Sequence, residues 1–180
     1  MADQKNMVLD VENLNVKFVL EEETVEAVNG ISLQIREGET LGLVGETGAG
    51  KTTTALSILR LIDSPPGVME CDKLEVCGED ILHMSVVELE HTRGSLVSMI
   101  FQDPMTSLNP VFTVGYQIAE SLERHEHLNK QEAWEKAEDM LELVGIPRER
   151  AIEYPHQFSG GMKQRVIIAI ALACSPKLLI

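Results

Sequence analysis

The stretch Gly45–Thr52, GETGAGKT, places glycines, a lysine and a threonine at the spacing of a phosphate-binding loop. Its glycines can take positive φ and let the loop wrap closely, so that successive N–H groups point inward as an anion nest. Lys51 can reach the β- and γ-oxygens of a nucleotide, and the Thr52 hydroxyl is a hard ligand suited to Mg²⁺. The stretch therefore predicts a site for a nucleoside triphosphate with Mg²⁺, and its residues are Gly45, Glu46, Thr47, Gly48, Ala49, Gly50, Lys51, Thr52 and Thr53.

The segments on either side of this loop favour the same interpretation. Residues 40–45, TLGLVG, form an apolar run without alternation, which is typical of a parallel strand covered on both faces. Residues 51–62 are expected to form a helix, whose N-terminal dipole favours an anion. A strand, a loop and a helix in this order are the required context; the alternative is a glycine-rich turn that happens to precede a lysine. Residues 95–102 and 177–180 are expected to form two further buried strands.

The N-terminal part has the alternation of a half-buried antiparallel sheet. Apolar residues share one face in two segments, with Leu14, Val16 and Phe18 in the first and Ile31, Leu33 and Ile35 in the second. The acidic residues 21–24 are a plausible hairpin loop, and Gly38 makes a turn. Residues 73–80 are expected to form another short strand and turn.

The pattern from about Val114 to Glu153 is helical. Asn129 is a good N-cap with Glu132 placed for a capping box, and Glu132 with Lys136 makes a favourable i,i+4 pair. We expect Gly145 and Pro147 to end this helix. Its apolar stripe is most simply core, and comprises Ala133, Trp134, Ala137, Met140, Leu141 and Val144. Ser159 is a natural N-cap for a later apolar helix, and His125 and His127, in a polar stretch, are expected to be solvated.

Composition excludes several classes of protein. The 180 residues are 44% hydrophobic and 24% charged, which indicates a globular domain. The net charge of −14 argues against a nucleic-acid partner or a polybasic membrane patch. Three cysteines match no zinc spacing and are expected to be reduced thiols. The longest apolar run, Val166–Cys174, is far shorter than the roughly 20 residues of a spanning helix.

Two further stretches point to a family. With residues 101–110, FQDPMTSLNP, and 158–165, FSGGMKQR, the chain resembles the ATP-binding-cassette (ABC) ATPases from about residue 8 to 180, most closely those of oligopeptide and dipeptide importers. The resemblance implies an α/β fold, a P-loop NTPase core with an N-terminal antiparallel β-subdomain and an α-helical signature subdomain. The corresponding ranges are 8–38 and 68–80 for the β-subdomain, 39–64 and 95–103 for the core, 112–174 for the helical subdomain, and 176–180 for the start of the Walker B strand.

The resemblance also implies roles for individual residues. Gln102 matches the Q-loop glutamine, which contacts Mg²⁺ or the attacking water; the alternative is an ordinary polar residue at a strand end. Ser159, Gly160, Gly161 and Met162 match the family signature, with Phe158 and Met162 replacing its usual Leu and Gln. A capped helix start of this kind suits a γ-phosphate, which in the family belongs to the opposite subunit. Phe18 matches the aromatic that stacks on adenine, although it could equally be core.

The function implied is ATP binding and hydrolysis that energise an ABC importer for di- or oligopeptides, at the cytoplasmic face of the inner membrane. Its partners would be transmembrane permease subunits and a second ATPase subunit, identical or different, in a head-to-tail dimer. The family's hydrolytic Asp and Glu and its switch His have no counterpart in these 180 residues. We therefore expect an N-terminal portion truncated before them, which binds Mg-ATP at best without turnover. A non-peptide importer and a soluble ABC ATPase of repair or translation stay open as interpretations, although QDPMTSLNP and FSGGM weigh against the soluble ATPase.

Overall fold

A computed structural model describes residues 6–102 and 107–180 of the chain. Contacts between Cα atoms divide the chain into two compact units, which meet at Glu90 and His91. They are called here the first unit and the second unit, and each is described by itself.

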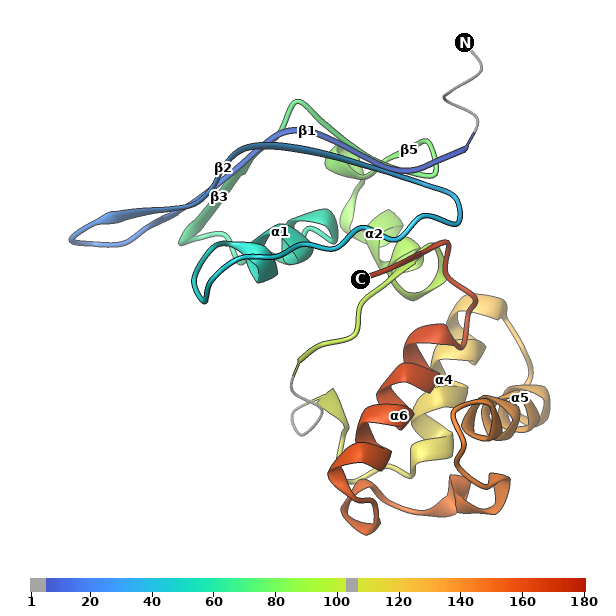
Figure 1. Cartoon of the computed structure of the whole chain (residues 1–180). Coiled ribbons are helices and arrows are strands. Elements are labelled where there is room, and N and C mark those ends of the chain that lie inside the picture. The colour runs from blue at the N-terminus through green and yellow to red at the C-terminus, as the bar shows by residue number, and fades with distance from the viewer. Residues whose placement is uncertain (1–5, 103–106) are drawn as a thin grey trace. The chain divides into compact units, whose positions relative to one another are not determined.

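The first unit is built on a five-stranded antiparallel sheet (Figure 1). Its strands are β1 (Met7–Val19), β2 (Thr24–Arg36), β3 (Gly67–Glu70), β4 (Lys73–Val76) and β5 (Glu79–Asp80). They follow the order β2-β1-β4-β5, and β3 also pairs with β1. Leu14 and Val16 are buried on β1, and Ile31, Leu33 and Ile35 of β2 are half-buried between exposed polar residues. The predicted half-buried antiparallel sheet is confirmed.

The predicted turns of the first unit are also confirmed. The Leu20 N–H donates to the Glu23 carbonyl at 2.9 Å and closes the acidic hairpin loop between β1 and β2. Gly38 takes φ of 75° in the turn after β2. The hairpin loop joins β1 to β2, and the turn at Gly38 leads from β2 toward the phosphate-binding loop.

The prediction for residues 40–45 is wrong. This segment forms no strand, and its apolar side chains are exposed, with Leu41 at 49%, Leu43 at 50% and Val44 at 91%. A parallel strand needs a hydrogen-bonded neighbour and cover on both faces. Neither sheet in the described part of the chain includes this segment. Its apolar side chains therefore lack the cover that the sequence pattern predicted.

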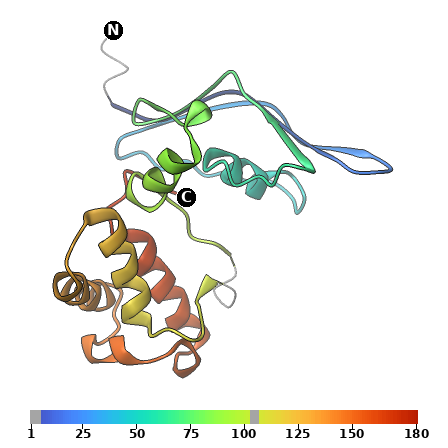
Figure 2. The same ribbon diagram turned by 180° about the vertical axis from the view of Figure 1, so that it is seen from behind.

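Helix α1 (Lys51–Ile58) follows the loop and lies along the β1–β2 ribbon in both views (Figures 1 and 2). It is shorter than the predicted range 51–62, because Leu59 caps it and Arg60 takes a left-handed φ of 50°. The short 3₁₀ helix η2 (Ile81–His83) and helix α2 (Val86–Ser95) lead to the second unit.

The second unit contains a short parallel pair of strands, β6 (Val97–Ser98) and β7 (Leu178–Leu179). The Ile180 N–H donates to the Ser98 carbonyl at 2.9 Å, and the Ile100 N–H donates to the Ile180 carbonyl at 2.8 Å. The predicted strands are present and parallel but shorter than expected. Leu178 is 5% exposed and Leu179 is 44% exposed, so β7 is covered on one face and not on both.

The remaining elements of the second unit are helical. Among the described residues they include α4 (Val114–Glu126), α5 (Lys130–Leu143), the 3₁₀ helices η3 (Arg148–Ile152) and η4 (Pro155–Gln157), and α6 (Gly160–Leu172). Figures 1 and 2 show α4 and α6 side by side, and both helices supply buried residues to one apolar cluster. Ala133, Ala137 and Leu141 of α5 are fully buried in this cluster, which confirms the predicted core stripe.

The capping box at Asn129 and Glu132 is present as predicted. The predicted ion pair between Glu132 and Lys136 is not formed, since Lys136 instead pairs with Glu126. The reason is that the Glu132 carboxylate already accepts the Asn129 backbone N–H at 3.1 Å.

The expectation for His125 is also wrong. Its ring packs against Gly94, and its Nδ1 is buried without a hydrogen-bond partner in the part of the chain that the structure describes. Burial, ahead of the nearby Arg124 and His91, lowers the pKa of His125. His127, by contrast, is exposed as predicted. Within residues 6–102 and 107–180, no helix is long and apolar enough to cross a membrane.

Candidate nucleotide-binding site

The phosphate-binding loop is shaped by glycines in the left-handed region. Gly48 has φ of 85° and Gly50, which caps the start of α1, has φ of 79°. A Cβ atom on Gly50 would lie 2.2 Å from the Ala27 carbonyl oxygen of β2. Since real Cβ atoms do not approach backbone that closely, only glycine fits this position without a shift.

The close approach of Gly50 to Ala27 has a cause in the sheet. In the register of β1 with β2, Val16 pairs with Val28 and Lys17 pairs with Glu26, which leaves Ala27 as the extra residue of a bulge. A bulge bends its strand and leaves the extra residue out of the ladder. The Ala27 carbonyl meets Gly50 at this irregularity, and so β2 fixes where α1 begins.

Lys51 lies inside the loop that it follows. Its Nζ donates to the Gly45 carbonyl at 2.7 Å and to the Glu46 carbonyl at 2.6 Å. An ammonium has three donors, so one proton remains for an anion in the loop. The lysine therefore closes the loop and brings a positive charge to it.

The start of α1 supplies the other donors. The first intrahelical bond runs from the Thr54 N–H to the Gly50 carbonyl at 2.8 Å, so the N–H groups of Lys51, Thr52 and Thr53 have no intrahelical acceptor. The first turn holds no acidic residue. The Thr52 side chain is exposed at this end. Free N–H groups, a helix dipole and a lysine together fit a di- or triphosphate, and the exposed hydroxyl fits a hydrated Mg²⁺.

Phe18 is half-buried near the end of β1, in the same unit as the loop. Its Cε1 lies 3.4 Å from the point where a Cβ on Gly67 would stand, and Phe18 pairs with Gly67 across the sheet. The ring therefore packs on the β1–β3 pair with part of its surface open. Stacking on adenine stays a prediction.

Gln102 belongs to the second unit and is exposed just beyond β6. The prediction that it ends a strand is wrong, since β6 ends at Ser98 and Gln102 lies in a bend four residues later. It still follows the parallel pair β6–β7, and parallel strands gather ligands at their carboxyl ends. Residues 103–106 of the FQDPMTSLNP stretch lie outside the described residues. The contact of Gln102 with Mg²⁺ or water stays a prediction.

The signature turn, defined here as Ser159–Met162, opens helix α6. Ser159 caps the helix as predicted, and its Oγ accepts the Met162 N–H at 3.4 Å. Gly160 and Gly161 are exposed, and a Cβ on either would meet nothing within 4 Å. The turn thus presents free N–H groups at a helix start with open space before them.

Sequence reasoning missed the residue on which the flanks of this turn converge, Arg150. Its guanidinium contacts Glu153, Gln157, Phe158 and Met162. The hydrogen bond from Arg150 lowers the pKa of Glu153 and raises the pKa of Arg150 itself. The i,i+3 spacing of Arg150 and Glu153 shortly before FSGGM is the only signal that the sequence offered.

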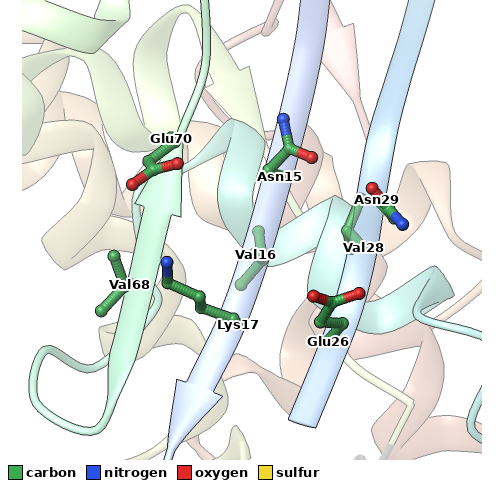
Figure 3. Close-up of a pocket in the computed structure, with 8 residues that line it drawn as sticks. All are labelled: Asn15, Val16, Lys17, Glu26, Val28, Asn29, Val68 and Glu70. Atoms are coloured by element: carbon green, nitrogen blue, oxygen red, sulfur yellow. The ribbon is translucent and has the colours of Figure 1, made fainter. Parts of the chain in front are cut away.

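A small pocket of about 150 Å³ lies on the sheet of the first unit, and none of the predicted site residues lines it (Figure 3). It is a depression over β1, β2 and β3 lined by Asn15, Val16, Lys17, Glu26, Val28, Asn29, Val68 and Glu70.

These features define an ABC ATPase cassette, and comparison with known proteins gives the same class. The ABC transporter family model matches residues 28–180, so the chain belongs to this family, as the sequence motifs predicted. The dimeric ATP-binding cassette MJ0796 in a post-hydrolysis state with ADP and Pi superposes with a TM-score of 0.82 at 24% identity, covering 95% of this chain and 72% of that one. A cassette of the Clostridium perfringens cbiONQ complex, cbiO1, gives 0.70 at 26% identity, with 97% and 64% covered. The predicted α/β cassette fold is confirmed.

Curated relatives give a narrower resemblance. The chain is 48% identical over 180 residues to the glutathione import ATP-binding protein GsiA of Shigella dysenteriae serotype 1, and 47% identical to that of Escherichia coli K12. Each alignment covers 96% of this chain, which spans 29% of the length of those relatives.

Proposed function

We propose that the full-length protein is the ATP-binding and ATP-hydrolysing subunit of an importer for small peptides. The observation that carries this proposal is the phosphate-binding loop, in which the Lys51 ammonium lies among loop carbonyls beside the free N–H groups of α1. The similarity to GsiA supports peptides of the glutathione type as cargo. A non-peptide cargo or a non-transport role is the alternative.

The first unit would bind the nucleotide. Gly45–Thr53 would hold its phosphates through N–H groups, and Lys51 would turn its Nζ from a loop carbonyl to the β- and γ-oxygens. Thr52 would hold Mg²⁺, and Phe18 would stack on adenine. Bound Mg²⁺ would neutralise charge that develops on the phosphates during transfer. The chain spans 29% of the length of its curated relatives, and hydrolysis is proposed for the full-length protein.

The signature turn would bind the γ-phosphate of a nucleotide held by a second ATPase subunit. The open space at Gly160 and Gly161 supports this role, because nothing in the described part of the second unit fills it. Two subunits, identical or different, would then close head to tail on two ATP molecules. A dimeric state is recorded for the structurally similar cassette MJ0796.

Transmembrane permease subunits are the second proposed partner. An apolar patch lies shortly after the Q-loop glutamine, where Val111 is 69%, Phe112 42% and Tyr116 42% exposed. The rings of Phe112 and Tyr116 stack at 4.8 Å, which gives the patch a defined surface. Exposed apolar clusters of this kind mark interaction sites. The protein would accordingly sit peripherally at the cytoplasmic face of the inner membrane.

A lysine substitution tests the nucleotide site. In the full-length protein, Lys51→Ala should weaken Mg-ATP binding by about 10- to 100-fold, because it removes charge-assisted bonds to phosphate. Turnover should fall with it. Lys17→Ala, in the same unit but in the pocket of Figure 3, is the matched control and should bind ATP as the wild type does. Equal ATP affinity of the Lys51 variant and this control would overturn the proposal.

A further inference from the structure

We propose that Arg150 is a positioning residue for the signature turn and holds Ser159–Met162 in the orientation that receives the γ-phosphate. The inference rests on the proposed function for that phosphate contact. Its structural part, the ordering of the turn by Arg150, stands on the geometry of the second unit.

Arg150 contacts the two residues before the turn and the last residue of the turn. Before it, Nη2 donates to the Gln157 carbonyl at 3.2 Å and the guanidinium carbon lies 4.3 Å from the centroid of the Phe158 ring. At its end, Nη1 lies 3.3 Å from the Met162 sulfur. One rigid group therefore ties together the residues that enter and leave Ser159–Gly161.

The guanidinium is itself held in place. Glu153 Oε2 accepts from Nε at 2.9 Å and from Nη2 at 2.6 Å. The Glu153 carbonyl accepts the N–H of Val114, the first residue of α4, at 2.9 Å. Phe158 is 5% exposed and belongs to the apolar cluster of the second unit. Arg150 is thus anchored to the helical core of the second unit.

The turn itself has few other constraints. Gly160 and Gly161 have no side chains to pack, and open space surrounds them. The Ser159 cap is a long bond of 3.4 Å. Gln157 and Ser159 are both exposed. Flanking contacts must therefore supply the order that the glycines lack, and those contacts meet at Arg150.

Arginine suits this role for a specific reason. Its planar group can bond Glu153 at one edge, reach a carbonyl and a sulfur at others, and stack its face on Phe158. Lysine keeps the charge but is a point donor that cannot do all of these at once. The proposal therefore predicts that Arg150→Lys behaves more like Arg150→Ala than like the wild type.

The experiment compares full-length variants by two readouts. Hydrogen exchange of the Met162 and Lys163 amides, which bond to Ser159, reports the order of the turn, and it should quicken in Arg150→Ala and Arg150→Lys. ATP turnover should fall about 10- to 100-fold, as for small displacements of reacting groups, while ATP affinity stays that of the wild type. Arg148→Ala is the matched control, since Arg148 lies in the same 3₁₀ helix but pairs at the surface with Glu138 and Asp139. It should change neither readout.

Each outcome decides between the possibilities. Amide exchange in Arg150→Lys equal to that of Arg148→Ala would overturn the positioning role. Faster exchange with unchanged turnover would overturn its relevance to the reaction. Should Arg150→Ala unfold, Arg150→Lys and Phe158→Leu replace it, because both keep most of the buried volume. A wild-type protein that neither binds nor hydrolyses ATP would contradict the proposed function instead, and the exchange readout would still decide the role of Arg150.

Discussion

The phosphate-binding loop and the signature turn are both glycine-rich helix starts, but they are held in opposite ways. At the loop, Gly50 packs closely against β2, with the Ala27 carbonyl oxygen 2.2 Å from where a Cβ would stand. At the turn, Gly160 and Gly161 face open space. Gly50 is required by the fold of the first unit. Nothing in the described part of the second unit prevents a small side chain at Gly160 or Gly161.

The difference extends to how each helix start is closed. Lys51 closes the loop from within by donating to two of its carbonyls. The turn is held from outside, by the Ser159 cap and the Arg150 contacts on its flanks. A loop that must surround a bound phosphate needs inward donors, whereas a turn that must meet a phosphate from another molecule needs an unobstructed front. Glycine thus permits a required backbone conformation at the phosphate-binding loop, and it leaves access open at the signature turn.

The largest effect expected from this comparison is that of Gly50→Ala. Alanine must adopt φ of 79° and displace the Ala27 backbone, and left-handed strain plus overpacking should cost about 2–4 kcal/mol. The fall should appear in the chemical unfolding of the full-length protein, together with loss of ATP binding. Gly38→Ala is a control that separates strain from the clash, since Gly38 has φ of 75° with nothing within 4 Å. A loss of stability at Gly50 no larger than at Gly38 would contradict the close contact between Gly50 and Ala27.

Local patterns in the sequence predicted the parts of this comparison that depend on neighbouring residues. The glycine spacing of the loop, the Ser159 cap and the capping box at Asn129 each follow from interactions within a few residues. The alternation of β1 and β2 likewise predicted their sheet, because the period of apolar residues states which face is buried.

Features that depend on distant partners could not be predicted in this way. The exposure of residues 40–45 follows from which segments pair with which, and an apolar run does not carry that information. Arg150 joins residues on both sides of η4, and its use of Phe158 is invisible to any periodicity. The Nδ1 of His125 is buried because Gly94, at a kink distant in sequence, leaves room for the ring. The close contact at Gly50 depends on a bulge at Ala27, and no sequence motif indicates the position of that bulge.

The open space at the signature turn can be tested at Gly161. Gly161→Ala should leave the fold intact and stabilise it by about 0.5 kcal/mol, because alanine is the better helix former and its methyl group meets nothing. Turnover of the full-length protein should nevertheless fall, since the methyl group occupies the space proposed for the γ-phosphate. Parallel measurement of the melting temperature and of ATPase activity tests this. A variant that loses stability would show that the turn is packed like the loop.

The smallest effect concerns pH and again separates the two units. Burial lowers the pKa of His125 in the folded protein, so the unfolded chain binds the proton more readily. Stability of the second unit should therefore be complete above the ordinary histidine pKa of 6.5 and decline as pH falls below it toward the lowered value. Protonation would place a proton on Nδ1, which has no acceptor among the described residues.

Hydrogen exchange of α4 at pH 8 and pH 5.5, corrected for intrinsic rates, checks the decline. An ordinary histidine is mostly neutral at pH 8 and mostly protonated at pH 5.5, on either side of its pKa of 6.5. The only histidine of the first unit in the described residues, His83, is exposed and bonded to Asp80, so the sheet around the phosphate-binding loop provides the internal reference. His125→Gln should remove most of the difference in α4, because its amide does not titrate. An equal decline in both units, or one that persists in this variant, would assign the pH dependence to the net charge of −14 and not to the buried ring.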